Sequence, residues 1–242
     1  MPLYIGTSQA LQINSCGNTG KLQLSIPTLT IPEEYVLVEY LESSGTQYIN
    51  SGITASGTII TEVKYQSFVG NKCIVGAGNS SGVRYQIYAS SNGNHYVEFS
   101  DGYSNLDKTP FTELSTIKLD PISKKAIING NEFELSYTGT VDARPLWLFG
   151  RNQSSNSANY RSSTKMYYCK MWDGNTLVRN FVPCYRKSDA KGGMYDFVTK
   201  QFFTNSGTGE FLYSTVDSVR LLSLDNYILT DSNGVYIIAN EN

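Results

Sequence analysis

Hydrophobic and polar residues alternate along short segments of this chain of 242 residues, and turn-forming residues separate the segments. A period of two places one face of a strand toward a core and the other toward solvent. Leu177–Val182 is the clearest case: it follows the tight-turn sequence Asp173-Gly174-Asn175 and runs back as a half-buried antiparallel strand would. Because no amphipathic helix of three turns is visible, the pattern predicts an all-β protein.

The predicted strands recur at intervals of about 8 to 12 residues, which is typical of a two-sheet antiparallel sandwich. We expect one principal domain over residues 34–213, with a β-segment at 1–33 and a β-hairpin at 214–242. The strands expected in the principal domain are Tyr35–Leu41, Thr58–Tyr65, Lys72–Val75, Val83–Ala89, His95–Phe99, Ser115–Leu119, Lys125–Ile128, Glu132–Tyr137, Leu146–Phe149, Lys165–Trp172, Leu177–Val182 and Phe197–Phe203.

The two terminal segments are expected to contain short strands of their own. In residues 1–33 we expect strands at Leu3–Ile5, Ala10–Asn14 and Lys21–Ile26, with a turn at 15–20. An Asn-Gly turn at 233–234 predicts a second hairpin near the C-terminus. The N-terminal edge is short and weakly charged, so it either pairs with another chain or packs on its own sandwich.

Composition and charge narrow the classes of partner. Aromatic residues make up 12% of the chain and charged residues 17%, which favours strands and turns over helices. The formal net charge of −2 gives no electrostatic reason to expect a nucleic acid. We expect no membrane insertion and no signal peptide, since no apolar run approaches the ~20 residues of a membrane span.

The four cysteines are Cys16, Cys73, Cys169 and Cys184, and none lies in a CxxC or zinc-binding spacing. A turn at 173–176 would place Cys169 opposite Asn180, so that Cys184 is poorly placed for a bridge across the hairpin. We therefore expect free, mostly buried thiols, as in a reducing cytoplasm. We assign no metal and no cofactor.

Two stretches of the sequence resemble a known domain family. VEYLESSGTQYINSGI at 38–53 and WDGNTLVRNFVPCYRKSDAKGGMYDFVTKQFFTNSGTG at 172–209 resemble concanavalin A-like (laminin G-type) jelly-roll domains. Such domains occur in structural proteins of tailed bacteriophages and in some bacterial surface proteins. MPLYIGTSQ at 1–9 and RLLSLDNYILTDSNGVYI at 220–237 resemble terminal modules of virion proteins in crAss-like phages.

This resemblance implies a structural component of a phage virion, assembled in the host bacterial cytoplasm. It would be an oligomeric head fibre or capsid decoration whose partners are copies of itself, capsid proteins and host glycans. Residues 1–33 would attach it to the particle. The alternatives are a tail-fibre or receptor-binding protein, a soluble carbohydrate-binding protein, a glycan-processing enzyme and a bacterial surface adhesin.

Catalysis is not expected. Glucanases on related scaffolds use a Glu-x-Asp-x-x-Glu run, which this chain lacks. Glu132 and Glu134 share one strand face, but Phe133 between them would be core, so both carboxylates should face solvent. His95 lacks the context of a catalytic triad and is expected to be a half-buried structural residue. Trp147 and Trp172 are expected in the core or an interface.

Carbohydrate binding is the function that the polar and aromatic positions favour. Alternation places His95 and Phe99 on the apolar face of their strand, and Tyr96 and Glu98 on the other face. If the preceding strand pairs with this one, its polar and aromatic residues lie beside Tyr96 and Glu98. The loop 150–161 adds amides, two arginines and a tyrosine at an expected end of the sandwich. An exposed sheet surface or a subunit interface would use the same residue types. The candidate carbohydrate-binding residues are Arg84, Gln86, Tyr88, Tyr96, Glu98, Arg151, Asn152 and Tyr160.

Overall fold

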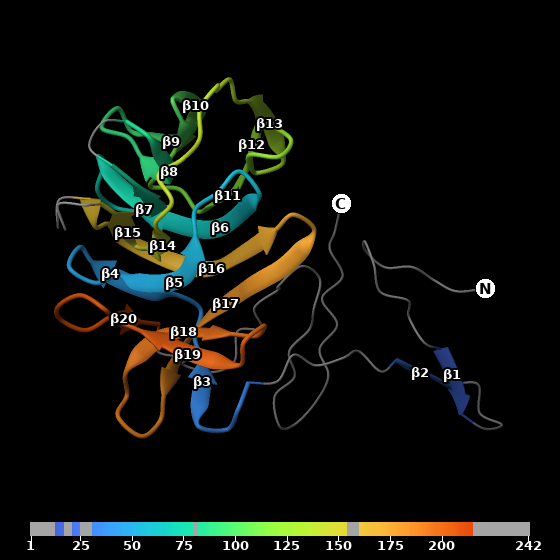
Figure 1. The fold of residues 1–242 in the computed structure, drawn as a ribbon. Coiled ribbons are helices and arrows are strands. Elements are labelled where there is room, and N and C mark those ends of the chain that lie inside the picture. The colour runs from blue at the N-terminus through green and yellow to red at the C-terminus, as the bar shows by residue number, and fades with distance from the viewer. Residues whose placement is uncertain (1–12, 17–20, 25–30, 80–81, 154–159, 215–242) are drawn as a thin grey trace. The chain divides into compact units, whose positions relative to one another are not determined.

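The protein is an all-β sandwich in the computed structural model, which describes residues 13–16, 21–24, 31–79, 82–153 and 160–214 (Figure 1). The chain divides into two compact units, and Ile31–Thr215 is the larger. The described part of the other unit is the antiparallel pair β1 (Ile13–Cys16) and β2 (Lys21–Leu24). In the described residues, no helix is long and apolar enough to cross a membrane.

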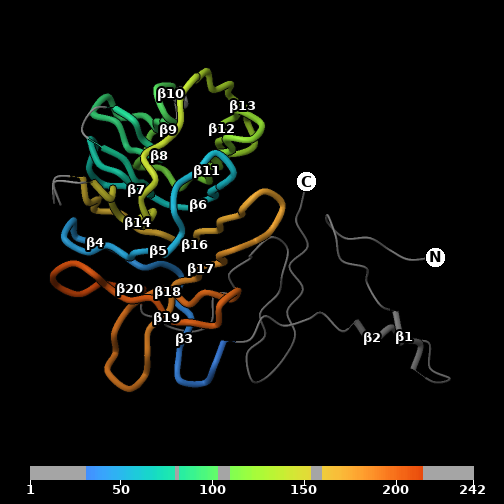
Figure 2. The backbone as a smooth tube through the Cα atoms, viewed as in Figure 1, coloured from blue at the N-terminus to red at the C-terminus, as the bar shows by residue number. Residues whose placement is uncertain are grey.

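The larger unit contains two sheets, whose course Figure 2 traces. The seven-stranded sheet has the order β10-β9-β8-β7-β14-β5, with β15 beside β7. Its pairs are antiparallel except for β15 with β7, which is parallel. Its strands are β5 (Ile49–Thr54), β7 (Lys72–Gly78), β8 (Arg84–Ala89), β9 (Asn94–Ser100), β10 (Gly102–Pro110), β14 (Pro145–Leu148) and β15 (Gly150–Asn152).

The eleven-stranded sheet has the order β13-β12-β11-β6-β16-β17-β18-β19, with β3, β4 and β20 joined at its side. It brings together strands that are far apart in the sequence, because β6 lies between β11 and β16. Its strands are β3 (Tyr35–Leu37), β4 (Leu41–Ser44), β6 (Ile59–Ser67), β11 (Ser115–Asp120), β12 (Lys125–Ile128), β13 (Asn131–Glu134), β16 (Ser163–Asp173), β17 (Thr176–Arg186), β18 (Gly192–Asp196), β19 (Gln201–Thr204) and β20 (Leu212–Tyr213).

The core lies between the two sheets and is built from alternate residues of their strands. Along β6 every second side chain is buried, beginning with Ile59. Burial of these apolar side chains is the main stabilising term, at roughly 25 cal/mol per Å² of apolar surface. The buried cluster includes, from both sheets, Val63, Tyr65, Tyr85, Ile87, Val97, Phe99, Ile117, Leu119, Leu148, Cys169 and Met171.

Two tyrosine hydroxyls cross the core and join the sheets. Tyr85 of β8 donates to the carbonyl of Ile59, at 3.0 Å, and hydrogen-bonds Thr61 Oγ1 at 2.8 Å. Tyr65 of β6 lies 2.5 Å from His95 Nδ1, and His95 Nε2 lies 3.2 Å from Ser115 Oγ. His95 is therefore fully buried rather than half-buried, and both of its ring nitrogens have partners.

The two stretches that carry the family resemblance meet in space. Gln47 Oε1 accepts hydrogen bonds from the Ser43 hydroxyl and the Ser44 amide, while its Nε2 donates to the Glu210 carbonyl at 2.9 Å. Asn205 Oδ1 accepts from the Tyr48 amide at 3.2 Å. These buried and half-buried amides tie the beginning of the principal domain to its end, so the motifs have a structural role.

A second motif residue organises the turn between β18 and β19. Asp196 is fully buried, and its carboxylate accepts hydrogen bonds from the backbone amides of Asn180, Val198 and Thr199 and from the Thr199 hydroxyl. Arg179 Nε lies 3.7 Å from the same carboxylate. These contacts satisfy the buried charge and explain the Asp in the GMYD sequence of the resemblance.

The predicted two-sheet antiparallel sandwich is confirmed, and most predicted strands are present within a few residues. The strand β10 was not predicted, since its sequence is polar and its pairing depends on β9. The predicted strand Tyr35–Leu41 is two strands, β3 and β4, and the strand predicted at 132–137 ends at Glu134. Phe197–Lys200 forms a turn, so that strand begins only at Gln201.

Register and turn positions also differ in three places. A bulge between Met171 and Trp172 pairs Cys169 with Phe181 rather than with Asn180. In the N-terminal unit β1 runs to Cys16, so the turn is shorter than the predicted 15–20. The strand predicted at Leu3–Ile5 and the C-terminal hairpin predicted within 214–242 lie outside the described residues.

The cysteines with described side chains are free. Cys73, Cys169 and Cys184 are buried and form no disulfide, as predicted. Burial raises the pKa of the Cys73 and Cys184 thiols to about 12 and raises that of Cys169 further. At neutral pH these groups stay protonated and act as small apolar side chains.

The buried histidine makes the stability depend on pH. Burial lowers the pKa of His95 from 6.5 to about 4. Between these values the unfolded chain binds a proton that the folded protein excludes, so stability is present above pH 6.5 and falls as the pH is lowered toward 4, by up to about 3 kcal/mol. Urea unfolding at pH 7 and pH 4.5 measures this loss.

The non-titrating variant His95→Gln provides the comparison. Other acidic groups contribute equally to both proteins, so the variant should show a smaller decrease in unfolding free energy between the two pH values. The same decrease in both proteins would contradict the assigned role of His95.

Candidate functional site

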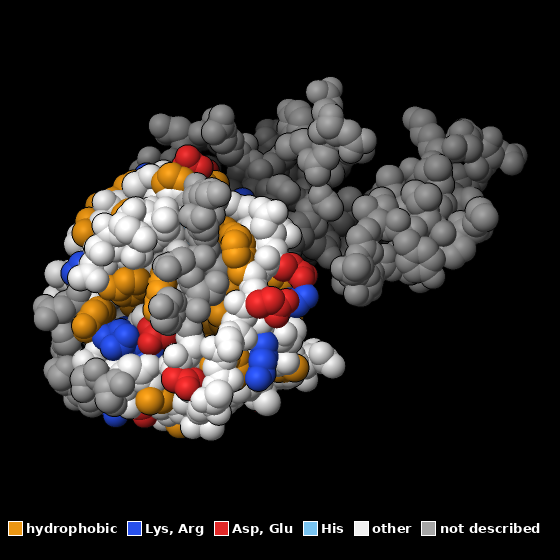
Figure 3. All heavy atoms as spheres, turned by 90° about the horizontal axis from the view of Figure 1, so that it is seen from above, with side chains coloured by type: hydrophobic (Ala, Val, Ile, Leu, Met, Phe, Trp, Pro, Cys, Tyr) orange, Lys and Arg blue, Asp and Glu red, His pale blue; other side chains and the backbone are white. Residues whose placement is uncertain are grey.

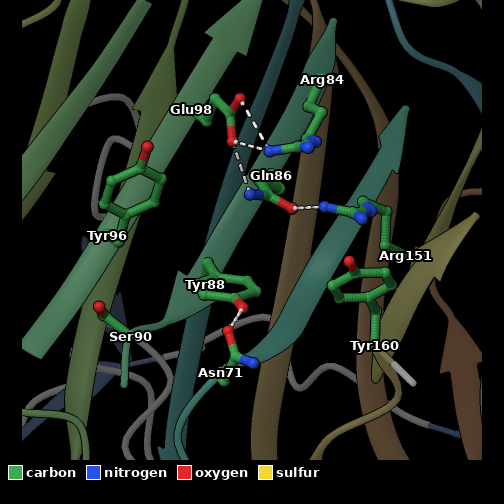
Figure 4. Close-up of a pocket in the computed structure, with 9 residues that line it drawn as sticks. All are labelled: Asn71, Arg84, Gln86, Tyr88, Ser90, Tyr96, Glu98, Arg151 and Tyr160. Atoms are coloured by element: carbon green, nitrogen blue, oxygen red, sulfur yellow. Dashed lines mark hydrogen bonds and ion pairs between the residues drawn. The ribbon is translucent and has the colours of Figure 1, made fainter. Parts of the chain in front are cut away.

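A pocket of about 300 Å³ lies on the face of the seven-stranded sheet that points away from the core (Figure 4). In the close-up, Gln86 and Tyr88 occupy the middle, Glu98 and Tyr96 lie to one side, and Arg151 and Tyr160 lie to the other. The volume is at the lower end of the range for small-molecule sites. The lining residues are Asn71, Arg84, Gln86, Tyr88, Ser90, Tyr96, Glu98, Arg151 and Tyr160.

Strand alternation places the pocket side chains. In β8 the core takes Tyr85, Ile87 and Ala89, so the residues between them face outward. In β9 the core takes His95, Val97 and Phe99 in the same way. The antiparallel register then sets outward residues of the two strands directly opposite each other, as Gln86↔Glu98 and Tyr88↔Tyr96.

A chain of polar contacts crosses the floor of the pocket. Arg84 Nη1 lies 3.3 Å from both carboxylate oxygens of Glu98, and Gln86 Nε2 donates to Glu98 Oε2 at 2.7 Å. On the other side, Arg151 Nη1 donates to Gln86 Oε1 at 3.0 Å. The orientation of the Gln86 amide follows from its neighbours, because an ionised carboxylate only accepts and a guanidinium only donates.

Arg151 extends this chain beyond β8. Its Nη2 donates to Gln153 Oε1 at 2.5 Å, and its guanidinium carbon lies 3.6 Å from the ring centroid of Tyr160. Arg151 is only 2% exposed and Gln86 is also 2% exposed. The polar groups are thus held in place by each other, and little rearrangement is needed to present them to a ligand.

Burial shifts the pKa of two pocket residues. Burial raises the pKa of Glu98, while the charges of Arg84 and Arg151 and the hydrogen bonds from Arg84 and Gln86 oppose that rise. Burial also raises the pKa of Tyr88 to about 12, so its phenol stays protonated and can donate to Asn71 Oδ1. The Tyr88 and Tyr96 rings lie edge to face, with centroids 6.1 Å apart.

Gly76 makes room for the link between Arg151 and Gln86. In the register of the sheet Gly76 of β7 lies between them, opposite Gln86 on one side and Arg151 on the other. A Cβ atom at this position would lie 2.7 Å from Cys73 Sγ, 2.8 Å from the Tyr85 carbonyl oxygen and 2.9 Å from Gln86 Cβ. Only glycine therefore fits at this position without movement of the backbone.

The predicted binding residues are brought together, with one exception. Asn152 does not line the pocket, because its amide donates to the Pro145 carbonyl at 2.9 Å. Gly150–Asn152 is also a strand and not part of an open loop, which explains why Arg151 is buried. Asn71 and Ser90 line the pocket but were not predicted, since they flank strands and share no pattern with the rest.

Other candidate groups lie apart from this pocket. Glu132 and Glu134 are exposed on β13, as expected, and Lys125 Nζ lies 2.5 Å from Glu132 Oε2. Trp147 is buried, and its ring stacks on that of Tyr48 with centroids 3.9 Å apart. Within the described residues no group of three or more His, Cys, Asp or Glu side chains is placed to hold a metal ion.

On the face shown in Figure 3, the described charged side chains of both signs are scattered among uncharged ones. No continuous basic surface is visible among the coloured residues of that view. A nucleic-acid interface would need such a surface.

Comparison with known proteins adds a distant structural likeness. No protein-family model matches the chain, and no curated protein matches it significantly. A solved structure described as "a putative carbohydrate binding protein from Bacteroides ovatus" is similar, with 15% sequence identity and a TM-score of 0.48. The match covers 76% of this chain and 61% of the other. A likeness with this identity and TM-score assigns no ligand to this chain.

Replacing Gly76 by Ala should distort the pocket. The added Cβ would meet two neighbours that cannot turn away, the Tyr85 carbonyl and Gln86 Cβ, so we expect a destabilisation of about 1–3 kcal/mol. The matched control is Gly57→Ala, where no atom lies within 4 Å of the added Cβ and a change of less than about 0.5 kcal/mol is expected. Equal unfolding free energies for both variants would contradict the packing described at Gly76.

Proposed function

We propose that the domain binds carbohydrate in the pocket on β8 and β9. The observation that supports this most strongly is the combination of tyrosine rings with a fixed row of planar polar groups. Tyr88, Tyr96 and Tyr160 offer apolar ring surface, while Arg84, Gln86 and Glu98 offer donors and acceptors that are already held by one another. Sugars need both kinds of contact, since their rings carry apolar C–H faces and many hydroxyl groups.

The size and placement of the pocket suit a sugar at the end or along the side of a longer chain. The cavity of about 300 Å³ accommodates a small ligand, and it lies on a sheet face rather than within the core. A rigid sheet fixes the spacing of the outward side chains. Weak binding at one such site becomes useful when several copies of the domain act together.

Tyr96→Ala tests the stacking contribution. The variant removes a half-buried ring from the pocket wall while leaving the row Arg84, Glu98 and Gln86 in place, so affinity for a bound glycan should fall by about tenfold, or about 1.4 kcal/mol. Tyr167→Ala is the control, because Tyr167 lies on β16 of the other sheet. Glycan-array screening followed by calorimetry measures both; a protein that binds no glycan at millimolar concentration would overturn the proposal.

We further propose that this domain is displayed on a phage particle as a head fibre or capsid decoration. The ground for this proposal is the resemblance of residues 1–9 and 220–237 to virion modules. In the alternative, a tail fibre or receptor-binding protein, the domain would also be displayed on the particle. Homo-oligomerisation and contact with capsid proteins are part of this proposal.

Deletion of residues 1–33 tests the attachment. The truncated protein should fail to enter particles, whereas the full chain should be detected on them by immunogold labelling with an antibody against residues 34–213. Incorporation of the truncated protein at the normal level would rule out attachment through this segment. The position of the label on the particle distinguishes attachment to the head from attachment to the tail.

We also propose that the domain binds glycans without cleaving them. Among the described residues that line the pocket, Glu98 is the only carboxylate, and it is engaged by Arg84 and Gln86. Glycosidases of the usual kind use two carboxylates that flank the scissile bond. Release of reducing sugar from any bound polysaccharide would contradict this proposal.

A further inference from the structure

Arg151 is a buried cation without a carboxylate partner among the described residues. It is 2% exposed, and its recorded contacts there are with neutral groups: the amide oxygens of Gln86 and Gln153 and the ring of Tyr160. Its Nε atom is buried and has no hydrogen-bond partner in the part of the chain that the structure describes. Burying a guanidinium is costly unless its charge is compensated. Neutral acceptors and a π face compensate it only in part.

The pocket as a whole carries an excess of positive charge. Of the described residues that line it, two carry a guanidinium group, Arg84 and Arg151, and one carries a carboxylate, Glu98. That carboxylate is already paired with Arg84 at 3.3 Å and receives a further hydrogen bond from Gln86. The charge of Glu98 is therefore engaged directly by Arg84 at one side of the pocket. Arg151 lies at the other side and acts on that carboxylate from across Gln86, and no carboxylate among the described residues contacts Arg151 directly.

The contacts of Arg151 leave donors for a ligand. A guanidinium has five N–H groups in a planar fork. Gln86 and Gln153 accept from Nη1 and Nη2, and Tyr160 holds the plane of the group from one face. Nη1 and Nη2 each keep one further N–H, and the fixed plane of the group sets the direction of both, which suits charge-assisted hydrogen bonds to an oxyanion.

From this geometry we propose that the pocket selects an acidic sugar, whose carboxylate or sulfate group pairs with Arg151 while the sugar ring lies against the tyrosines. The inference rests on the proposed carbohydrate-binding function and specifies its ligand class. The anion would complete the charge compensation of Arg151 and accept from its free N–H groups. Glu98, paired with Arg84, would accept from sugar hydroxyls on the opposite side of the pocket.

Oligogalacturonate and its methyl ester form a matched pair of ligands for the test, because esterification removes the charge of each carboxyl group and adds only a methyl group. A sulfated galactan oligosaccharide and its desulfated form are the second pair. The protein should bind the acidic member of at least one pair roughly 10- to 100-fold more tightly than the neutral member. Isothermal titration of the full chain measures both pairs, and the pair that shows the preference identifies the acidic group.

Variants assign the preference to one side chain. Arg151→Gln should remove the difference between acidic and neutral ligands, and Arg151→Lys should retain part of it, because it keeps the charge but loses the fork. Arg161→Gln is the control. Arg161 also has a buried Nε without a hydrogen-bond partner among the described residues, but its guanidinium lies over the Tyr48 ring, outside the pocket lining. Circular dichroism and thermal unfolding establish that each variant is folded.

The outcomes separate this inference from the function on which it rests. Equal affinity for acidic and neutral members in both pairs would overturn the acidic-sugar inference while leaving carbohydrate binding intact. Binding to none of these ligands, nor to any glycan on an array, would overturn both. If Arg151→Gln does not fold, Arg151→Lys still decides: an unchanged preference in that variant would show that the fork of Arg151 does not recognise the anion.

Discussion

Packing of the two sheets through alternate side chains is the constraint on which the pocket depends. Tyr85 and Phe99 must face the core, where the Tyr85 hydroxyl bonds to the opposite sheet, and this fixes the face on which every other residue of β8 and β9 lies. A slip of one residue would bury Gln86 and Glu98 among apolar groups and expose the core residues. The core and the pocket are thus two faces of the same pair of strands, and the stability of the first specifies the geometry of the second.

Burying the polar side chains on the outer face of the sheet costs free energy, and contacts between neighbouring strands reduce that cost. Glu98 and Arg151 are almost fully buried, and each would be destabilising alone. Gln86 lies between them and satisfies both, with its two amide ends pointing in opposite directions. Gly76 supplies the space for this bridge because it carries no side chain. Among the described residues no carboxylate contacts Arg151 directly, and this is the observation on which the proposed preference for an acidic ligand rests.

Local alternation was sufficient to predict the sandwich and the outward residues of β8 and β9, because each strand carries its own period of two. It also brought Arg151 and Tyr160 into the candidate set from composition alone. It could not predict β10, whose pairing is decided by its neighbour, or the parallel strand β15 that buries Arg151 beside β7. The bulge at Met171 and the bridging role of Gln86 depend on contacts between distant segments, which no local pattern records.

The most direct test of the account is to map a bound acidic oligosaccharide on the protein by NMR chemical-shift perturbation. We expect the largest shifts on the amides of β8, β9 and β15 and on the side chains of Gln86 and Arg151, whereas β16 and β17 of the opposite sheet should stay unchanged. Shifts concentrated on the opposite sheet, or on the segment 205–210 that closes the domain, would place the ligand elsewhere and contradict the assignment of this pocket.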